Sequence, residues 1–212
     1  MYLFDLDGTL IDSNGVWVEV DRVFLSRRGF TATPEYCHTV GHSIFPVAAQ
    51  YTKDYYHLEE SPQEIMDEWT ALAGDAYSHH VPLKEGAREF LEYSRDRGEP
   101  MVLTTACVPQ MCKAALKRHN LTPFFSSILF AQELGIEKRD PRYFQAVLTH
   151  LGVRAEDCTL FEDSPGACRT AKEAGIRVVG VYDPFYADYQ EELRAVSHRY
   201  IRSFTELLPK SN

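Results

Sequence analysis

Short apolar runs recur near both ends of the chain, and a long stretch with helical periodicity separates the first run from the others. Each run is apolar on both faces of an extended chain, which is typical of strands in a parallel sheet covered by helices on both sides. The runs are YLF at 2–4, MVLTT at 101–105, SILF at 127–130, CTLFE at 158–162 and RVVGVY at 177–182. We therefore predict parallel strands at these positions.

Helix start and stop signals lie between the later runs. Asp140-Pro141 is typical of an N-cap followed by proline at the first helical position, and Gly152 would end that helix. Its apolar face is formed by Phe144, Val147, Leu148 and Leu151. Ser164-Pro165 would begin the next helix and Gly175 would end it. This alternation from about residue 85 onward predicts an α/β fold with a doubly wound parallel sheet.

The segment between residues 14 and 82 shows helix signals and no convincing strand. Thr33-Pro34 predicts one helix start, and Ser61-Pro62-Gln63-Glu64 predicts another with a capping box. Apolar stripes at helical spacing are Val16, Val20, Val23 and Phe24, ending at Gly29, and Ile65, Trp69, Leu72 and Ala76. We expect a helical domain at 15–82, inserted into an α/β core formed by residues 1–14 and 83–212.

Two aspartates stand one residue apart at the end of the first predicted strand, in the sequence FDLDGTLIDS at 4–13. Residues i and i+2 of a strand face the same side, so Asp5 and Asp7 would project together, with roughly 6 to 7 Å between their Cα atoms. Gly8 then allows a free turn. In open α/β sheets the ligand crevice lies at the carboxyl ends of the strands, where these acids would sit. The alternative interpretation is a polar turn, because Asp and Gly are common turn residues.

Composition and charge restrict the class of protein and its partners. The 212 residues are 44% hydrophobic and 12% aromatic, as in an ordinary folded protein. A net charge of −9 disfavours nucleic acid and anionic membrane surfaces as partners. No apolar run reaches the roughly 18 residues that a membrane span needs, and no signal peptide is evident. We expect a cytoplasmic protein whose five cysteines are free thiols, because they form no CxxC pair.

Four segments resemble the motifs of the haloacid dehalogenase superfamily of phosphatases and phosphomutases. FDLDGTLIDS resembles the first motif, and MVLTTACVP resembles the second, with Thr105 as the matching hydroxyl and Thr104 as the other register. EKRDPRYF resembles the third through Lys138, although Arg139 replaces the usual proline. LFEDSPGACRTAKEAG resembles the fourth. The resemblance implies an α/β core with strand order 5-4-1-2-3 and identifies the helical insert as a cap, as in phosphoglycolate phosphatase and β-phosphoglucomutase.

The resemblance also implies roles for individual residues. Asp5 would be the nucleophile and Asp7 the general acid and base. Thr105, Ala106 and Lys138 would bind phosphate. Asp5, the carbonyl of Asp7, Asp163 and, through water, Glu162 would hold a metal ion. The cofactor would be Mg²⁺, because the implied ligands are all oxygen and because five negative charges would otherwise meet in one cleft.

These residues favour a Mg²⁺-dependent phosphatase that hydrolyses small phosphorylated metabolites through an aspartyl-phosphate. A β-phosphoglucomutase-like mutase is one alternative; that enzyme has a histidine in the early cap, and Asn14 and the neighbouring Gly15, Val16 and Trp17 offer none. A non-catalytic phosphate-binding member of the fold is the other alternative, although none of Asp5, Asp7 and Asp163 has been lost. Trp17 and His42 are candidates for substrate specificity. The physiological substrate and the oligomeric state stay open at this point.

Overall fold

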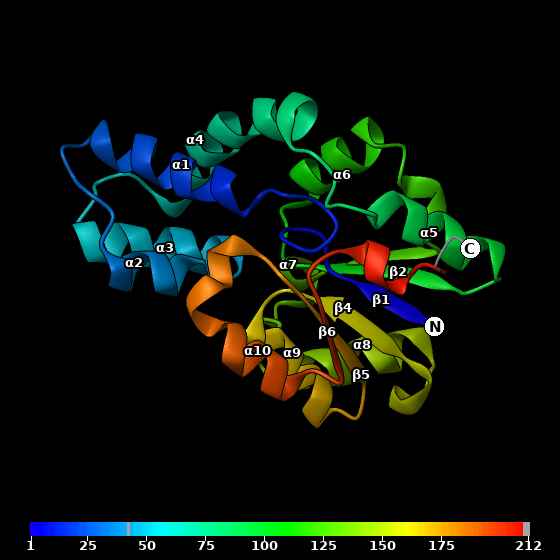
Figure 1. The fold of residues 1–212 in the computed structure, drawn as a ribbon. Helices are drawn as coiled ribbons and strands as arrows, with labels where there is room; N and C mark the ends of the chain where they lie inside the picture. The colour runs from blue at the N-terminus through cyan, green and yellow to red at the C-terminus, as the bar shows by residue number, and fades with distance from the viewer. Residues whose placement is uncertain (42, 210–212) are drawn as a thin grey trace.

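Six parallel strands form a single sheet in the order β3-β2-β1-β4-β5-β6 in the computed structural model, which describes residues 1–41 and 43–209 (Figure 1). The strands are β1 (Tyr2–Phe4), β2 (Met101–Thr105), β3 (Ser127–Phe130), β4 (Thr159–Glu162), β5 (Arg177–Val181) and β6 (Arg199–Ile201). The predicted fold class and the order 5-4-1-2-3 are confirmed for the first five strands. β6 was not predicted, because its three residues begin with the exposed Arg199 and offer little apolar pattern.

Helices cover both faces of the sheet (Figure 1). Phe4, Leu103 and Phe161 pack into one apolar cluster that includes residues of α5 and α6. Their neighbours Leu3, Val102 and Leu160 pack into a second cluster with residues of α8, α9 and α10. Successive strand residues therefore alternate between two buried layers, which explains why the strands carry continuous apolar runs.

The helices of the α/β part begin and end close to the predicted signals. They are α5 (Ala87–Asp96), α6 (Pro109–Arg118), α7 (Ala131–Leu134), α8 (Arg142–Leu151), α9 (Pro165–Glu173) and α10 (Gln190–Val196), with the short helical turns η2 (Thr122–Phe124), η3 (Ala155–Asp157), η4 (Pro184–Tyr189) and η5 (Phe204–Leu207). One boundary differs: Pro141, and not Asp140, is the N-cap of α8, while the Asp140 carboxylate accepts a hydrogen bond from the Arg142 amide at 2.9 Å. Gly152 ends this helix in a left-handed conformation, as expected.

A run of helices separates β1 from α5. It comprises α1 (Asn14–Ser26), α2 (Pro34–Val40), α3 (Phe45–Tyr56), α4 (Pro62–Asp75) and the π-helical turn η1 (Ala76–His80). The predicted caps are confirmed: the Thr33 side chain accepts the Tyr36 amide, and Ser61 and Glu64 form a capping box. α3 was not predicted, because Ile44 at its N-cap gives no side-chain signal.

The helical run packs around the aromatic ring of Trp69. Its ring centroid lies 5.7 Å from that of Phe24 on α1 and 5.5 Å from that of Phe45 on α3. Helices α1 to α4 lie beyond the carboxyl ends of the strands (Figure 1). The division into a core at 1–14 and 83–212 and a cap at 15–82 stays a prediction.

Two further expectations concern membrane and redox context. Across residues 1–41 and 43–209, no helix combines the length and the apolar character needed to cross a membrane. The five cysteines are all free thiols, as their spacing predicted.

Candidate active site

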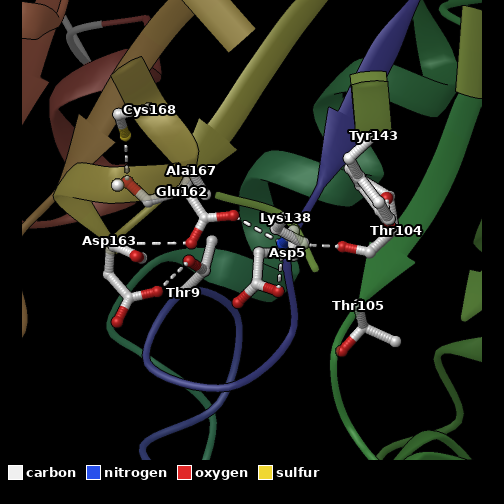
Figure 2. A network of polar contacts seen from close by, with 12 residues as sticks. Asp5, Thr9, Thr104, Thr105, Lys138, Tyr143, Glu162, Asp163, Ala167 and Cys168 are labelled. Atoms are coloured by element: carbon white, nitrogen blue, oxygen red, sulfur yellow. Dashed lines mark hydrogen bonds and ion pairs between the residues drawn. The ribbon is translucent and has the colours of Figure 1, made fainter. Parts of the chain in front are cut away.

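Two neighbouring strand ends bring three carboxylates together. Asp5 directly follows β1, while Glu162 ends β4 and Asp163 follows it. The two strands pair side by side, and the Asp5 amide donates to the Phe161 carbonyl at 3.0 Å. Oxygen atoms of the three acids all lie within 4.8 Å of one another, and all three residues are buried (Figure 2). The sheet thus holds three acidic groups in one small volume.

A single lysine lies against two of these acids. Lys138 Nζ donates to Asp5 Oδ1 at 2.7 Å, to Glu162 Oε2 at 2.5 Å and to the Thr104 carbonyl at 3.0 Å (Figure 2). The lysine belongs to the loop before α8, and Thr170 on α9 donates its hydroxyl proton to the Lys138 carbonyl at 2.6 Å. Hydrogen bonds therefore fix the loop through both the backbone and the ammonium group of Lys138. The next residue is Arg139, where the family motif usually has proline.

The pKa values of the site residues are shifted because ionisable groups are buried close together. Burial, and after it the Glu162 carboxylate, raises the pKa of Asp5 to about 8, although Lys138 opposes the shift. Burial and the neighbouring acids also raise the pKa of Asp163 well above its ordinary value. Burial alone would lower the pKa of Lys138, but the two carboxylates outweigh it and hold that pKa well above the ordinary value.

The cluster has the chemistry of a hard-cation site. Three buried acids face one ammonium group, so ionisation of all three would leave negative charge uncompensated in a low-dielectric environment, in agreement with the raised pKa values of Asp5 and Asp163. A divalent cation with oxygen ligands would complete the balance, and Mg²⁺ and Ca²⁺ both prefer such ligands. The residues present therefore fit a metal ion at Asp5, Glu162 and Asp163.

The loop after β1 orients Asp163. Thr9 donates its hydroxyl proton to Asp163 Oδ1 at 2.9 Å, and Asn14 Nδ2 donates to Oδ2 at 3.0 Å. The same Asn14 amide donates to Asp183, whose carboxylate also accepts from Lys84 Nζ at 2.6 Å. Gly8 makes this close approach feasible: its φ is +77°, and a Cβ there would lie 2.2 Å from Asp163 Oδ2.

Asp7 belongs to a separate hydrogen-bond chain that reaches the helical run. Its Oδ1 accepts from the Ser13 hydroxyl at 2.5 Å and from the Tyr77 hydroxyl. Trp17 Nε1 in turn donates to the Tyr77 oxygen at 2.7 Å. Tyr77 comes from η1, so residues on both sides of the helical run hold the Asp7 carboxylate.

The end of β2 supplies the remaining residues expected to bind phosphate. The hydroxyl groups of Thr104 and Tyr143 are hydrogen-bonded to each other at 2.6 Å. Because Thr104 is already engaged, this contact favours Thr105 as the hydroxyl residue of the second motif. Thr105 is fully buried, and its Oγ1 accepts from the Cys107 amide at 2.9 Å. Ala106 lines the pocket beside the acids, whereas Thr105 contributes no lining surface. The roles of Thr105 and Ala106 stay predictions.

One pocket of about 200 Å³ joins this acidic site to the helical run. Its lining includes Asp5, Asp7, Lys138, Glu162 and Asp163 from the sheet edge and Trp17, Asp21, Ile44, Phe45 and Trp69 from the helices. Trp17 thus reaches the pocket, as a specificity residue must. His42 lies outside the described residues, although its neighbours Gly41 and Ser43 line the pocket.

Several residues of the site were not predicted from the sequence. Asp183 carried a usable signal, because it lies just past the end of β5 as the other acids lie past β1 and β4. No sequence signal indicated Tyr77, since 70 residues separate it from Asp7, which it contacts. Asp21 looked like an ordinary polar position on an amphipathic helix, yet it lines the pocket.

Comparisons with known proteins found a matching family model and similar proteins. Residues 2–181 match the family model described as haloacid dehalogenase-like hydrolase. A phosphorylated carbohydrates phosphatase of Thermotoga maritima is 26% identical over 184 residues, which cover 84% of this chain and 83% of that protein. Hexitol phosphatase B of Escherichia coli is 26% identical over 211 residues, covering 98% and 94%. The structure of CbbY from Rhodobacter sphaeroides in complex with phosphate superposes with a TM-score of 0.80 at 20% identity, covering 97% and 95%.

We expect Asp21→Asn to stabilise the protein in a pH-dependent way. Burial raises the pKa of Asp21 to about 6, against the opposing hydrogen bond from Tyr36, so ionisation of this group opposes folding. That cost is complete above about pH 6 and disappears as the pH falls towards 4. Thermal melts should give the variant a Tm higher by about 2–4 °C at pH 8, with a smaller difference at pH 5.

Glu19→Gln, at an exposed position on the same helix, is the control; it loses only a solvent-exposed ion pair with Arg22, which contributes little to stability, so it should melt close to the wild type at both pH values. A lower Tm for Asp21→Asn at pH 8 would contradict this account of Asp21.

Proposed function

The chain belongs to the haloacid dehalogenase-like hydrolase family, and from this membership and the geometry of its acidic pocket we propose that it is a Mg²⁺-dependent phosphatase. Its substrates would be small phosphomonoesters, hydrolysed through an aspartyl-phosphate at Asp5. The observation that carries the proposal is the cluster of Asp5, Glu162, Asp163 and Lys138 at the carboxyl edge of the sheet, next to Asp7. The names of the phosphatase relatives support the same reaction class.

Asp5 is the nucleophile in this proposal. A carboxylate oxygen attacks phosphorus as the bond from phosphorus to the ester oxygen breaks, which leaves an acyl phosphate on Asp5 and releases the alcohol. Lys138, bound to Asp5 at 2.7 Å, orients the carboxylate and offsets the negative charge that gathers during transfer. Family members are usually Mg²⁺-dependent. Asp5, Asp163 and Glu162 would hold the ion, which would stabilise the negative charge of the phosphoryl oxygens.

Asp7 moves the protons. Ser13 and Tyr77 both donate to Oδ1, so the proton that Asp7 transfers would be carried on Oδ2. In the first step this proton passes to the leaving oxygen; in the second, Asp7 accepts a proton from the water that attacks the acyl phosphate, which releases inorganic phosphate and restores Asp5. The position of Asp7, two residues past the nucleophile, places both groups at one strand end.

Replacing Asp5 by Asn should abolish hydrolysis of p-nitrophenyl phosphate in the presence of Mg²⁺, with a loss in kcat of at least about a thousandfold, because the amide cannot form the acyl phosphate. Phosphate release measures the loss. Asp12→Asn is the matched control: this exposed acid lies in the same loop, its side chain makes no hydrogen bond or ion pair with the described residues, and the variant should keep activity close to that of the wild type. Activity that survives Asp5→Asn would rule out the covalent mechanism.

We expect Asp7→Asn to accumulate the phosphorylated protein. p-Nitrophenolate leaves without much help from an acid, so the first step continues, whereas hydrolysis of the acyl phosphate lacks its base. Intact-protein mass spectrometry after rapid acid quenching should show a phosphate adduct in Asp7→Asn and none in the double variant Asp5→Asn, Asp7→Asn. If hydrolysis proceeds at the wild-type rate in Asp7→Asn, another group moves the protons.

A further inference from the structure

The helical side of the pocket carries a single charge among the residues that the structure describes. Of the lining residues in α1 to α4 and the loops between them, Asp21 alone is charged, and it is negative. The two lining cations, Lys138 and Arg139, come from the loop before α8. Both are already paired, Lys138 with the acid cluster and Arg139 with Glu137 at 2.6 Å. A leaving group that extends towards the helices therefore meets a negative charge and no unpaired cation in this part of the chain.

Asp21 is held in place for an interaction that the described residues do not complete. Tyr36 on α2 donates its hydroxyl proton to Asp21 Oδ1 at 3.1 Å. The Tyr36 oxygen lies 3.0 Å from the Thr52 hydroxyl of α3, so three helices fix the orientation of the carboxylate. Oδ2 accepts no hydrogen bond from the residues described, and a carboxylate oxygen facing a pocket is a strong acceptor for a hydroxyl or amino hydrogen.

Trp69 forms the apolar part of the same side of the pocket. The residue is 3% exposed and lines the same pocket, and its indole Nε1 is buried without a hydrogen-bond partner in the described structure. The rings of Trp69 and Phe45, with centroids 5.5 Å apart, form an apolar wall on which the carbon face of a sugar or polyol can pack.

We propose that the leaving group of the substrate is uncharged and polyhydroxylated, with one hydroxyl donating to Asp21 and its carbon face packing on Trp69 and Phe45. This inference rests on the proposed phosphatase function and narrows it. Leaving groups that carry a carboxylate or a second phosphate are disfavoured, since their charge would face Asp21 and the described lining residues offer no unpaired cation to offset it. Asp21 is thus a specificity residue: its negative charge rejects anions, and Oδ2, which accepts no hydrogen bond from the described residues, binds hydroxyl groups.

Substrate pairs that differ only at the terminal carbon test the inference. Sorbitol 6-phosphate and 6-phosphogluconate form one pair, and glycerol 3-phosphate and 3-phosphoglycerate form a shorter one. In each pair a hydroxymethyl group replaces a carboxylate, and using both lengths allows for the distance between the acid cluster and Asp21. We expect the wild type to favour the alcohol by at least tenfold in kcat/KM in the pair whose terminal group reaches Asp21. Phosphate release with Mg²⁺ present gives each value.

The Asp21→Asn variant should reduce this alcohol-to-acid ratio by at least fivefold, because the amide no longer repels a carboxylate. The ratio is insensitive to the fraction of correctly folded protein, so a change in stability cannot produce the result. Glu19→Gln, on the surface of α1, should leave the ratio unchanged.

The outcomes separate this inference from the proposed function. Hydrolysis of p-nitrophenyl phosphate together with a preference for the carboxylate substrates, or an unchanged ratio in Asp21→Asn, would overturn the assignment of Asp21 and leave the phosphatase intact. Failure to hydrolyse any phosphomonoester, p-nitrophenyl phosphate included, would overturn the proposed function itself.

Discussion

The ion contacts of Lys138 with Asp5 and Glu162 hold the acidic edge of the sheet together. Each acid lies at the end of its own strand, and β1 and β4 are neighbours, so the fold forces like charges into contact. Without the ammonium group, burial of three carboxylates within 4.8 Å would strongly oppose folding. Lys138 can compensate only one of the three charges that full ionisation of the acids would create. The remaining charge is what makes the site suited to a cation and a phosphoryl group, so folding and chemistry depend on the same balance.

A second set of contacts connects that edge to the helical run. Asn14 and Asp183 link Asp163 to Lys84, which lies after η1. Ser13, just before α1, and Tyr77 of η1 both hold Asp7. The entry and the exit of the helical run are therefore both hydrogen-bonded to acids of the site. Any movement of the helices relative to the sheet would change the surroundings of Asp7 and Asp163, which are the groups proposed for proton transfer and metal binding.

The features of this arrangement that depend on local sequence pattern could be predicted from the sequence. The strand runs, the capping box at Ser61 and the acids past β1 and β4 are short-range signals, and a parallel sheet brings its strand ends to one edge. The contacts of Tyr77 and Asp21 depend on how separate helices pack, and no spacing in the sequence records that. β6 and α3 lacked apolar runs or caps strong enough to stand out. The motifs therefore predicted the acid cluster, while the substrate side of the pocket required the tertiary structure.

The central claim is that the cluster of Asp5, Glu162 and Asp163 binds a divalent cation, and thermal melts with and without Mg²⁺ after treatment with a chelator test it most directly. Ligand binding to the folded state alone raises Tm. The account predicts a clear rise in Tm with Mg²⁺ for the wild type and for the control Asp12→Asn, and little or none for Asp163→Asn. It also predicts that metal-free Asp163→Asn melts above the metal-free wild type, because one repelling charge is gone. Equal Mg²⁺-induced shifts in the wild type and Asp163→Asn, or no shift in the wild type, would contradict it.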